Sequence, residues 1–146
     1  MILTRDAAFL NSVANHPDVR PWLGTDGASP IDFAPLLARQ GTFALVNEHG
    51  GFVFVSDDGG ATYEFHTQFL PEGRGREALK AAHEAAQTMF GDIGVEELRT
   101  YVPHENRAAL GLVRLAGFRR THEDGDNSYW ALDRAIWQAR QPTAAL

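Results

Sequence analysis

The hydrophobic positions of this chain follow two different periods, and their order along the sequence predicts a mixed α/β domain. Apolar residues three to four positions apart indicate helices, whereas alternating or short continuous apolar runs indicate strands. Helical spacing covers Thr4 to His16, 31–39, about 75–90 and about 106–116, and strand patterns cover 42–47, 51–56, 61–70, 97–102, 119–123 and 128–132. The expected order is ααβββαβαββ, a mixed sheet with one right-handed β-α-β crossover.

The clearest strand is 61–70, because its side chains alternate strictly in character. Successive residues of a strand point to opposite faces of the sheet. One face should carry Tyr63, Phe65, Thr67 and Phe69, and the other should carry Glu64, His66 and Gln68. The helix that follows is rich in alanine, which allows a close approach to the sheet.

Composition narrows the class of protein. The 146 residues carry a net charge of −6, are 44% hydrophobic and 22% charged, and include no cysteine. We expect one globular domain over residues 1–140 and a short tail over 141–146. The absence of cysteine excludes disulfides and a cysteine nucleophile, and the acidic balance argues against nucleic-acid binding. No apolar run approaches the roughly 20 residues of a membrane span, so we expect a soluble, cytoplasmic protein without a membrane partner.

The turn at 71–76 (PEGRGR) joins the alternating strand directly to the alanine-rich helix. A glycine-rich strand-to-helix turn presents unpaired backbone N–H groups, which bind anions such as phosphate.

Three interpretations of this turn compete. The glycines could serve only the backbone conformation of an ordinary connection. The run Gly73-x-Gly75-x-x-Ala78 also matches a dinucleotide-binding fingerprint. That motif requires an apolar first strand and an acidic residue that ends the next strand, and here Glu96 and Glu97 open the next strand instead. A triphosphate-binding loop is excluded because no G-K-[ST] follows.

Two stretches together support the third interpretation. Residues 69–79 (FLPEGRGREAL) form a strand–turn–helix, and residues 106–118 (NRAALGLVRLAGF) carry an N-x-x-[AS]…GF pattern. The layout from Ile31 to Leu132 resembles the GNAT superfamily of acetyl-CoA-dependent N-acyltransferases. Within it, the end of the chain is most similar to the branch that acylates the N-terminal amines of ribosomal proteins.

The resemblance implies a GNAT-like fold and direct transfer of an acetyl group from acetyl-CoA to an amine-bearing acceptor, either a small molecule or a protein. It also implies contacts to coenzyme A at the strand–turn–helix and at the start of the next helix. The expected residues are Phe69, Leu70, Gly73, Arg74, Gly75, Arg76, Glu77 and Asn106. Asn106 could contact the pantetheine arm or cap its own helix.

The sequence departs from the family pattern at two places. Glu77 and Leu79 stand where small residues are usual, and Val113 stands where many members have a tyrosine that protonates the leaving thiolate. These departures leave open an alternative, a non-catalytic binding or structural module of the same fold, of the kind that bacteriophages carry.

The candidate catalytic residues are Glu64, His66 and His104, because an attacking amine must lose a proton to a base. The alternative explanations are a solvated strand face for Glu64 and His66, and a helix entry for His104. Trp22 lies in an irregular segment that borders the acceptor site in this family. The histidines show no metal-ligand spacing, so we expect no metal. A monomer or a homodimer is expected.

Overall fold

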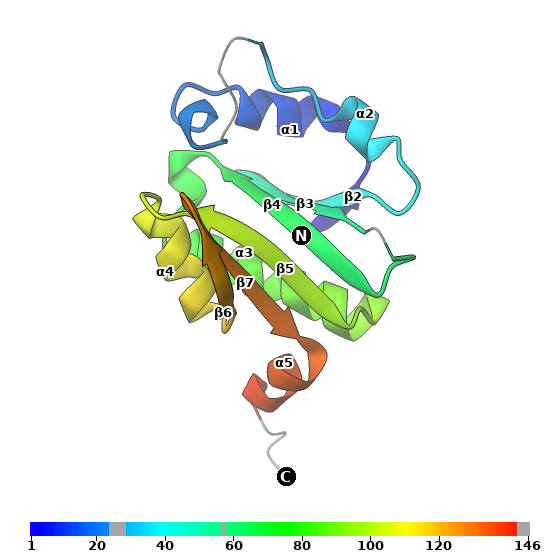
Figure 1. The fold of residues 1–146 in the computed structure, drawn as a ribbon. Helices are drawn as coiled ribbons and strands as arrows, with labels where there is room; N and C mark the ends of the chain where they lie inside the picture. Colours follow the sequence, from blue (N-terminus) through cyan, green and yellow to red (C-terminus); the bar gives the residue numbers. More distant parts are fainter. Residues whose placement is uncertain (24–28, 57, 143–146) are drawn as a thin grey trace.

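The computed structural model describes residues 1–23, 29–56 and 58–142. In these residues a mixed sheet of seven strands runs in the order β1-β2-β3-β4-β5-β7-β6 (Figure 1). The strands are β1 (Ile2–Thr4), β2 (Phe43–Asn47), β3 (Gly50–Val55), β4 (Thr62–Phe69), β5 (Glu97–Pro103), β6 (Arg119–Asp124) and β7 (Asn127–Asp133). Neighbouring strands are antiparallel except β4 and β5, which are parallel. The predicted mixed sheet is confirmed.

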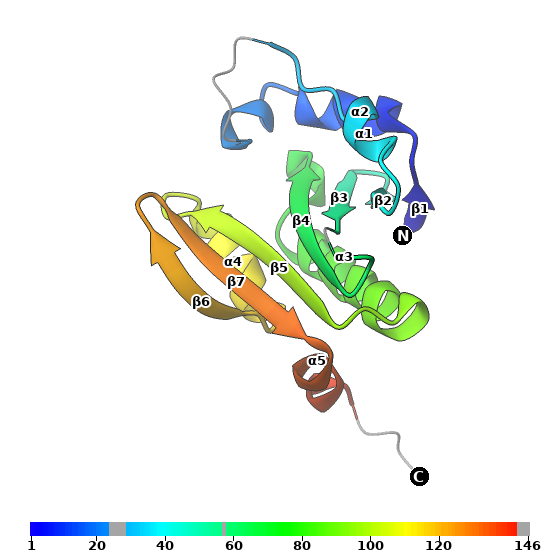
Figure 2. The same ribbon diagram turned by 45° about the vertical axis from the view of Figure 1, so that its right-hand side comes forward.

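Helices cover both faces of this sheet, with α1 and α2 on one face and α3 and α4 on the other (Figures 1 and 2). The helices are α1 (Ala7–Ala14), α2 (Ala34–Leu37), α3 (Arg76–Ala86), α4 (Arg107–Leu115) and α5 (Arg134–Arg140). Short 3₁₀ turns form at η1 (Arg20–Trp22) and η2 (Pro71–Gly73), and a π-helical turn, η3 (Gln87–Ile93), extends α3.

Apolar cores form on both faces of the sheet, because side chains alternate along the central strands. Val53 packs with Leu10 of α1 and Leu37 of α2. Its neighbours Phe52 and Phe54 point to the opposite face and pack with the alanines of α3. The sheet is thereby fixed between two layers, which makes it a rigid base for a site at its carboxyl ends.

The structure corrects the predicted boundaries at the start of the chain. Residues Ile2–Thr4 form an edge strand that the short apolar run did not reveal. Thr4, the first residue of the expected helical segment, therefore belongs to this strand. Asp6 is the N-cap of α1, because its carboxylate accepts a hydrogen bond of 3.0 Å from the N–H of Ala8.

Two other boundaries differ from the prediction. The second helix covers only Ala34–Leu37, because side chains of α1 hold the preceding backbone: Asn15 and Asn11 accept hydrogen bonds from the N–H groups of Ile31 and Phe33. The last helix, α5, was not predicted, although Asp133 caps it. Of the expected irregular segment, residues 24–28 lie outside the described residues, as do 143–146 of the expected tail.

Candidate functional site

The parallel strands β4 and β5 separate after a short paired segment. Their register covers only Thr62 to Glu64 on β4, opposite Glu97 to Arg99 on β5, whereas β5 pairs with β7 along its whole length. Beyond this segment the side chain of Thr100 donates a hydrogen bond of 3.0 Å to the carbonyl of Phe65. The carboxyl halves of the two strands then diverge and leave a wedge between them.

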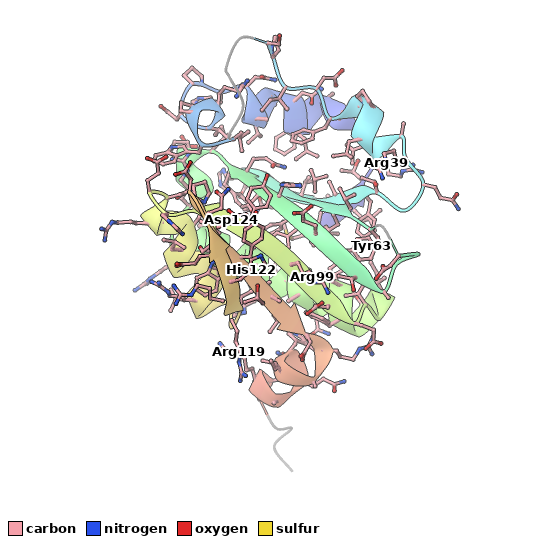
Figure 3. The ribbon with its side chains drawn as sticks, in the orientation of Figure 1. Arg39, Tyr63, Arg99, Arg119, His122 and Asp124 are labelled. Carbon is pink, nitrogen blue, oxygen red and sulfur yellow. The ribbon has the colours of Figure 1, made fainter. Side chains whose placement is uncertain are left out.

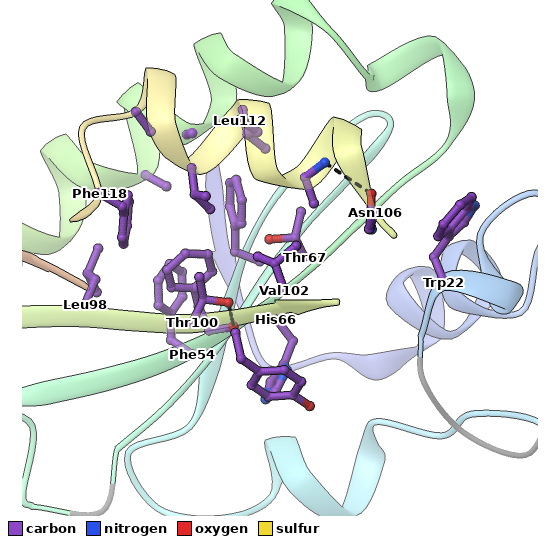
Figure 4. Close-up of a pocket in the computed structure, with 18 of the residues that line it drawn as sticks. Trp22, Phe54, His66, Thr67, Leu98, Thr100, Val102, Asn106, Leu112 and Phe118 are labelled. Carbon is purple, nitrogen blue, oxygen red and sulfur yellow. Dashed lines mark hydrogen bonds between the residues drawn. The ribbon is translucent and has the colours of Figure 1, made fainter. Parts of the chain in front are cut away.

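A cavity of about 180 Å³ occupies this wedge (Figure 4). Phenylalanines of β3 and β4 line its base, and small or aliphatic side chains of α3 and α4 form its wall, among them Ala82, Ala85, Ala109, Leu112 and Val113. Such walls leave room for a narrow, largely apolar ligand. The helical spacing predicted for about 106–116 is consistent with this lining, because Ala109, Leu112 and Val113 lie on one face of α4.

Backbone groups on the free edge of β4 point into the wedge. The N–H of Leu70 donates to His49 on the β3 side, and the carbonyl of Phe65 accepts from Thr100 on the β5 side. Because backbone polar groups alternate along a strand, Thr67 and Phe69 also direct theirs toward β5. β4 therefore offers N–H donors where the neighbouring strand has moved away.

The turn between β4 and α3 leaves the start of α3 open. The N-cap residue Gly75 has φ 67° and ψ −128°, a conformation that glycine adopts without strain, and within the described chain no side chain caps this helix. Gly73 is packed closely, because an added Cβ would lie 2.4 Å from the Cβ of His49. Arg76 and Glu77 are exposed in the first turn of α3. An open helix start with nearby arginines is a suitable anion site.

Arg74 has a structural role in the same turn. Its Nε donates to the carbonyl of Phe69 at 3.1 Å, and its Nη2 donates to the carbonyl of Asp18 at 2.6 Å. Asp18 lies just before η1, which carries Trp22. Arg74 therefore links the turn after β4 to the segment on the opposite face of the sheet.

Asn106 begins α4 and caps it. Its side-chain oxygen accepts a hydrogen bond of 3.1 Å from the N–H of Ala109, so the capping role is present. Asn106 also lines the cavity, and Trp22 lines the same end of it (Figure 4). Trp22 is 50% exposed.

The three candidate catalytic residues do not all meet at the cavity. His66 lines it, and the carboxylate of Glu64 lies 3.9 Å from Nε2 of His66. His104 follows the end of β5 and does not line the cavity. Its Nε2 lies 3.8 Å from a carboxylate oxygen of Glu123. The third polar residue of this strand face, Gln68, is only 2% exposed, and among the described residues neither of its amide atoms has a hydrogen-bond partner.

The strands β5, β6 and β7 form a polar face next to the cavity, and none of its residues was among the predicted site residues. Figure 3 shows Arg99, His122 and Asp124 along these strands. The hydroxyl of Tyr129 donates a hydrogen bond of 2.8 Å to Asp124, and this bond raises the pKa of Tyr129. Hydrogen bonds from the N–H of Thr62 and the hydroxyl of Ser56 lower the pKa of Asp58, so this carboxylate stays ionised at neutral pH.

Thr67, Thr100 and Tyr101 line the cavity and were not among the predicted site residues. Threonine and tyrosine are common in β-strands, so their residue type alone did not mark them as site residues. Only the location of Thr67 and Thr100, on the two strands that flank the crossover, could have indicated that they line the site.

Comparison with solved structures identifies the fold to which this chain is similar. No protein-family model matches the chain, and no curated protein does. Among solved structures, AAC(6')-Ib in complex with paromomycin and acetyl-CoA has 20% identity and a TM-score of 0.74 over 98% of each chain. A GNAT-family acetyltransferase from Bacillus anthracis has 20% identity and a TM-score of 0.67, over 86% of this chain and 87% of that one.

The spermidine N-acetyltransferase of Vibrio cholerae, in complex with CoA and spermine, has 15% identity and a TM-score of 0.74, over 94% of this chain and 97% of that one. The chain has the GNAT fold. Both the wedge and the open start of α3 depend on β4 and α3: Phe65 and Thr67 of β4 and Ala82 and Ala85 of α3 line the wedge, and Gly75 lies in the turn that joins the two elements.

Two further observations bear on the class of protein. None of the helices in the described residues combines the length and the apolar character needed to cross a membrane. Over the same residues, no group of three or more His, Asp or Glu side chains is placed to hold a metal ion.

Proposed function

We propose that this protein is an acetyl-CoA-dependent N-acetyltransferase that transfers the acetyl group directly to a primary amine. The observation that carries the proposal is that one strand–turn–helix, β4 to α3, supplies both the alanine-lined wall of the wedge and a helix start that no side chain caps among the described residues. Acetyl-CoA has a narrow arm that ends in a thioester and a pyrophosphate at a distance from it. The site offers a match for each part.

The pyrophosphate would bind at the start of α3, where no side chain of the described residues caps the first backbone N–H groups. Arg74 and Arg76 add positive charge beside these groups. The pantetheine arm would follow the free edge of β4 into the wedge, with the amide nitrogen of Asn106 as a further donor, because its oxygen is engaged in the cap. The predicted contacts at Phe69, Leu70, Gly73 and Gly75 lie along the same path.

The chemistry needs a polarised carbonyl and a base. The N–H of Phe69, directed into the wedge, would stabilise the charge that develops on the acetyl oxygen. The amine nitrogen attacks the carbonyl carbon, the carbon–sulfur bond breaks, and the sulfur leaves as a thiolate. The proton that the amine loses goes to His66, which Glu64 orients. Val113 is buried against Val102 and Trp130, so it supplies no proton to the thiolate.

The first experiment is calorimetric titration of the protein with acetyl-CoA, followed by measurement of free thiol release with a panel of amines. The panel contains small amines, a lysine peptide and a peptide with the N-terminus of a ribosomal protein. Binding with release of thiol supports the proposal. Absence of binding at submillimolar acetyl-CoA would refute it.

Matched substitutions test the base. His66→Gln should lower kcat about a hundredfold, because general base catalysis typically contributes this much, while the Kd for acetyl-CoA stays the same. Glu64→Gln should lower kcat less. His104→Gln is the control, because His104 does not line the cavity. A larger loss in His104→Gln than in His66→Gln would reverse this assignment.

A second candidate function is a non-catalytic binding or structural module of the same fold, which does not use coenzyme A. The replacement of the usual tyrosine by Val113 and the carboxylate of Glu77 at the open helix start favour it. Glu77→Gly distinguishes the two functions. Tight binding in the parent protein supports the enzyme, whereas absence of binding in both proteins supports the module.

Finer assignments stay predictions. The solved structures carry spermine and paromomycin as amine ligands, which suits an amine acceptor here without naming it. The similarity to the ribosomal-protein branch, the cytoplasmic location and the monomeric or homodimeric state are expectations from the sequence.

A further inference from the structure

A row of four aromatic rings crosses the sheet face that α1 and α2 leave open. The rings belong to His66 on β4, Tyr101 on β5, Tyr129 on β7 and His122 on β6. Successive centroids lie 5.9 Å, 5.9 Å and 4.3 Å apart, and the last two rings are stacked at 6°. We call these residues the aromatic row. Tyr101 is 41% exposed, although it is a large aromatic residue.

The aromatic row connects the wedge to a second hollow. His66 and Tyr101 line the wedge, whereas Tyr129 and His122 line a groove of about 640 Å³ that extends from the start of β4 across β5, β7 and β6. Strands of a sheet are about 4.8 Å apart, so Tyr129 lies about 5 Å and His122 about 10 Å from β5 across the sheet. The row therefore leads outward from the proposed base.

The groove is negatively charged. Its lining includes the carboxylates of Asp58, Glu64 and Glu97 and one guanidinium, that of Arg99. Three negative charges and one positive charge leave a net charge of −2. Arg99 is paired with Glu97 at 2.6 Å. Asp124 adds a carboxylate at the outer end, where it accepts the hydrogen bond of Tyr129.

Aromatic faces next to carboxylates favour one ligand chemistry. The face of an aromatic ring attracts a cation through its quadrupole, and carboxylates attract the same cation. The hydrogen bond from Tyr129 to Asp124 leaves more electron density on the phenol ring, which strengthens this attraction. Arg119 is in register with Ala131, which lines the groove, and it lies at the opposite end of β6 from Asp124.

We propose that the aromatic row is a subsite for a second cationic group of the acceptor, so that the preferred acceptor is an elongated diamine or polyamine. One amine reacts in the wedge beside His66, and a distal ammonium lies over Tyr101, Tyr129 and His122. This inference rests on the proposed function, because it assigns the acceptor class for the same transfer.

The test compares α,ω-diaminoalkanes of four to ten carbons with amino alcohols of equal length. Each pair differs only in the distal charge. We expect kcat/KM to be about tenfold or more higher for the longer diamines, a difference of about 1.4 kcal/mol. Short diamines, whose distal ammonium does not reach Tyr129, should show a smaller preference.

Substitutions locate the effect. Tyr129→Leu and His122→Leu should each raise KM for the diamine several-fold and leave KM for the amino alcohol unchanged. Tyr129→Phe keeps the ring and should keep most of the preference. His83→Leu removes an exposed ring on α3, on the opposite face of the sheet, and serves as the matched control.

The outcomes separate this inference from the proposed function. If amines are acetylated but diamines and amino alcohols react equally, the aromatic row is not the subsite and the transferase activity stands. If acetyl-CoA does not bind or no amine is acetylated, the proposed function fails, and direct calorimetric titration with a diamine decides the subsite. Diamine binding that Tyr129→Leu abolishes would support it, whereas equal binding in parent and variant would overturn it.

Discussion

Two strand-to-helix turns lie at the same end of the sheet, and they differ in whether a side chain caps the helix that follows. The turn after β4 starts α3 with Gly75, and in the described chain no side chain caps this helix. The turn after β5 starts α4 with Asn106, whose side chain accepts a hydrogen bond from Ala109. The two parallel strands therefore end in one open and one closed helix start.

The difference teaches where an anion can bind. The first backbone N–H groups of any helix lack partners within the helix, and a cap satisfies one of them internally. At α4 the asparagine does so, whereas at α3 no side chain of the described residues does, and Arg76 is the first helical residue. The open start follows β4, the strand that lines the wedge with Phe65 and Thr67, so the proposed pyrophosphate site lies at the helix start that no described side chain caps.

The strongest test closes the open turn. Gly75→Asp should supply a capping carboxylate and a negative charge at the start of α3, and we expect the Kd for acetyl-CoA to rise about a hundredfold, or about 2.7 kcal/mol. Because φ of residue 75 is 67°, Gly75→Ala introduces the same backbone strain as Gly75→Asp but no carboxylate. It should cost about tenfold. Calorimetric titration of both variants measures the difference.

Gly111→Ala is the control on α4. An added Cβ at Gly111 meets nothing within 4 Å, and alanine is the better helix former, so this variant should be more stable by about 0.5–1 kcal/mol with unchanged binding. Equal losses of affinity in Gly75→Asp and Gly75→Ala would show that only the turn geometry matters, and that the open helix start does not select the ligand.

The second test removes the bridge from the open turn to the opposite face of the sheet. Arg74→Gln loses the hydrogen bonds to Phe69 and Asp18, so we expect about tenfold weaker binding of acetyl-CoA and a more mobile Trp22. Arg76→Gln loses only an exposed charge and should cost about threefold. Tryptophan fluorescence anisotropy and calorimetry measure the two effects. An unchanged anisotropy in Arg74→Gln would contradict the bridge.

The third test opens the closed turn. Asn106→Ala should lower the free energy of unfolding by about 1 kcal/mol, and the melting temperature by about 3 °C, because the cap of α4 is lost. Asn106→Asp keeps a capping oxygen and should keep most of the stability. Thermal unfolding monitored by circular dichroism distinguishes them. If Asn106→Ala instead weakens acetyl-CoA binding more than tenfold without loss of stability, the residue acts on the ligand and not on the helix.

The sequence was a good guide to the elements and a partial guide to the site. Strong alternation identified β4, and helical spacing identified α3 and α4, because both patterns are long enough to be unambiguous. Three residues were too few to reveal β1. The helix α2 is short because Asn11 and Asn15 accept hydrogen bonds from the backbone that precedes it. These contacts join segments that are distant in the sequence, so the local pattern of residues does not predict them.

The site was predictable where it depends on backbone conformation. Gly73 and Gly75 marked the turn, because a tight approach and a positive φ both require glycine. The divergence of β4 from β5 and the aromatic row arise from strand pairing between distant segments. Tyr101 and Tyr129 come together only because β7 inserts between β5 and β6. Such neighbours have no signature in a single sequence.

The smallest expected effect concerns charge at the two turns. Glu77 lies in the first turn of α3, where its carboxylate interacts favourably with the positive end of the helix dipole but repels a pyrophosphate. Glu77→Gln should therefore destabilise the fold by about 0.5 kcal/mol and lower the Kd for acetyl-CoA about threefold at low ionic strength, with less effect at high salt. Glu105→Gln removes the same charge just before α4. Because α4 is capped by Asn106, the Kd of the Glu105→Gln variant for acetyl-CoA should match that of the parent protein. An equal decrease of Kd in both variants would mean that net charge, and not the open helix start, governs the affinity.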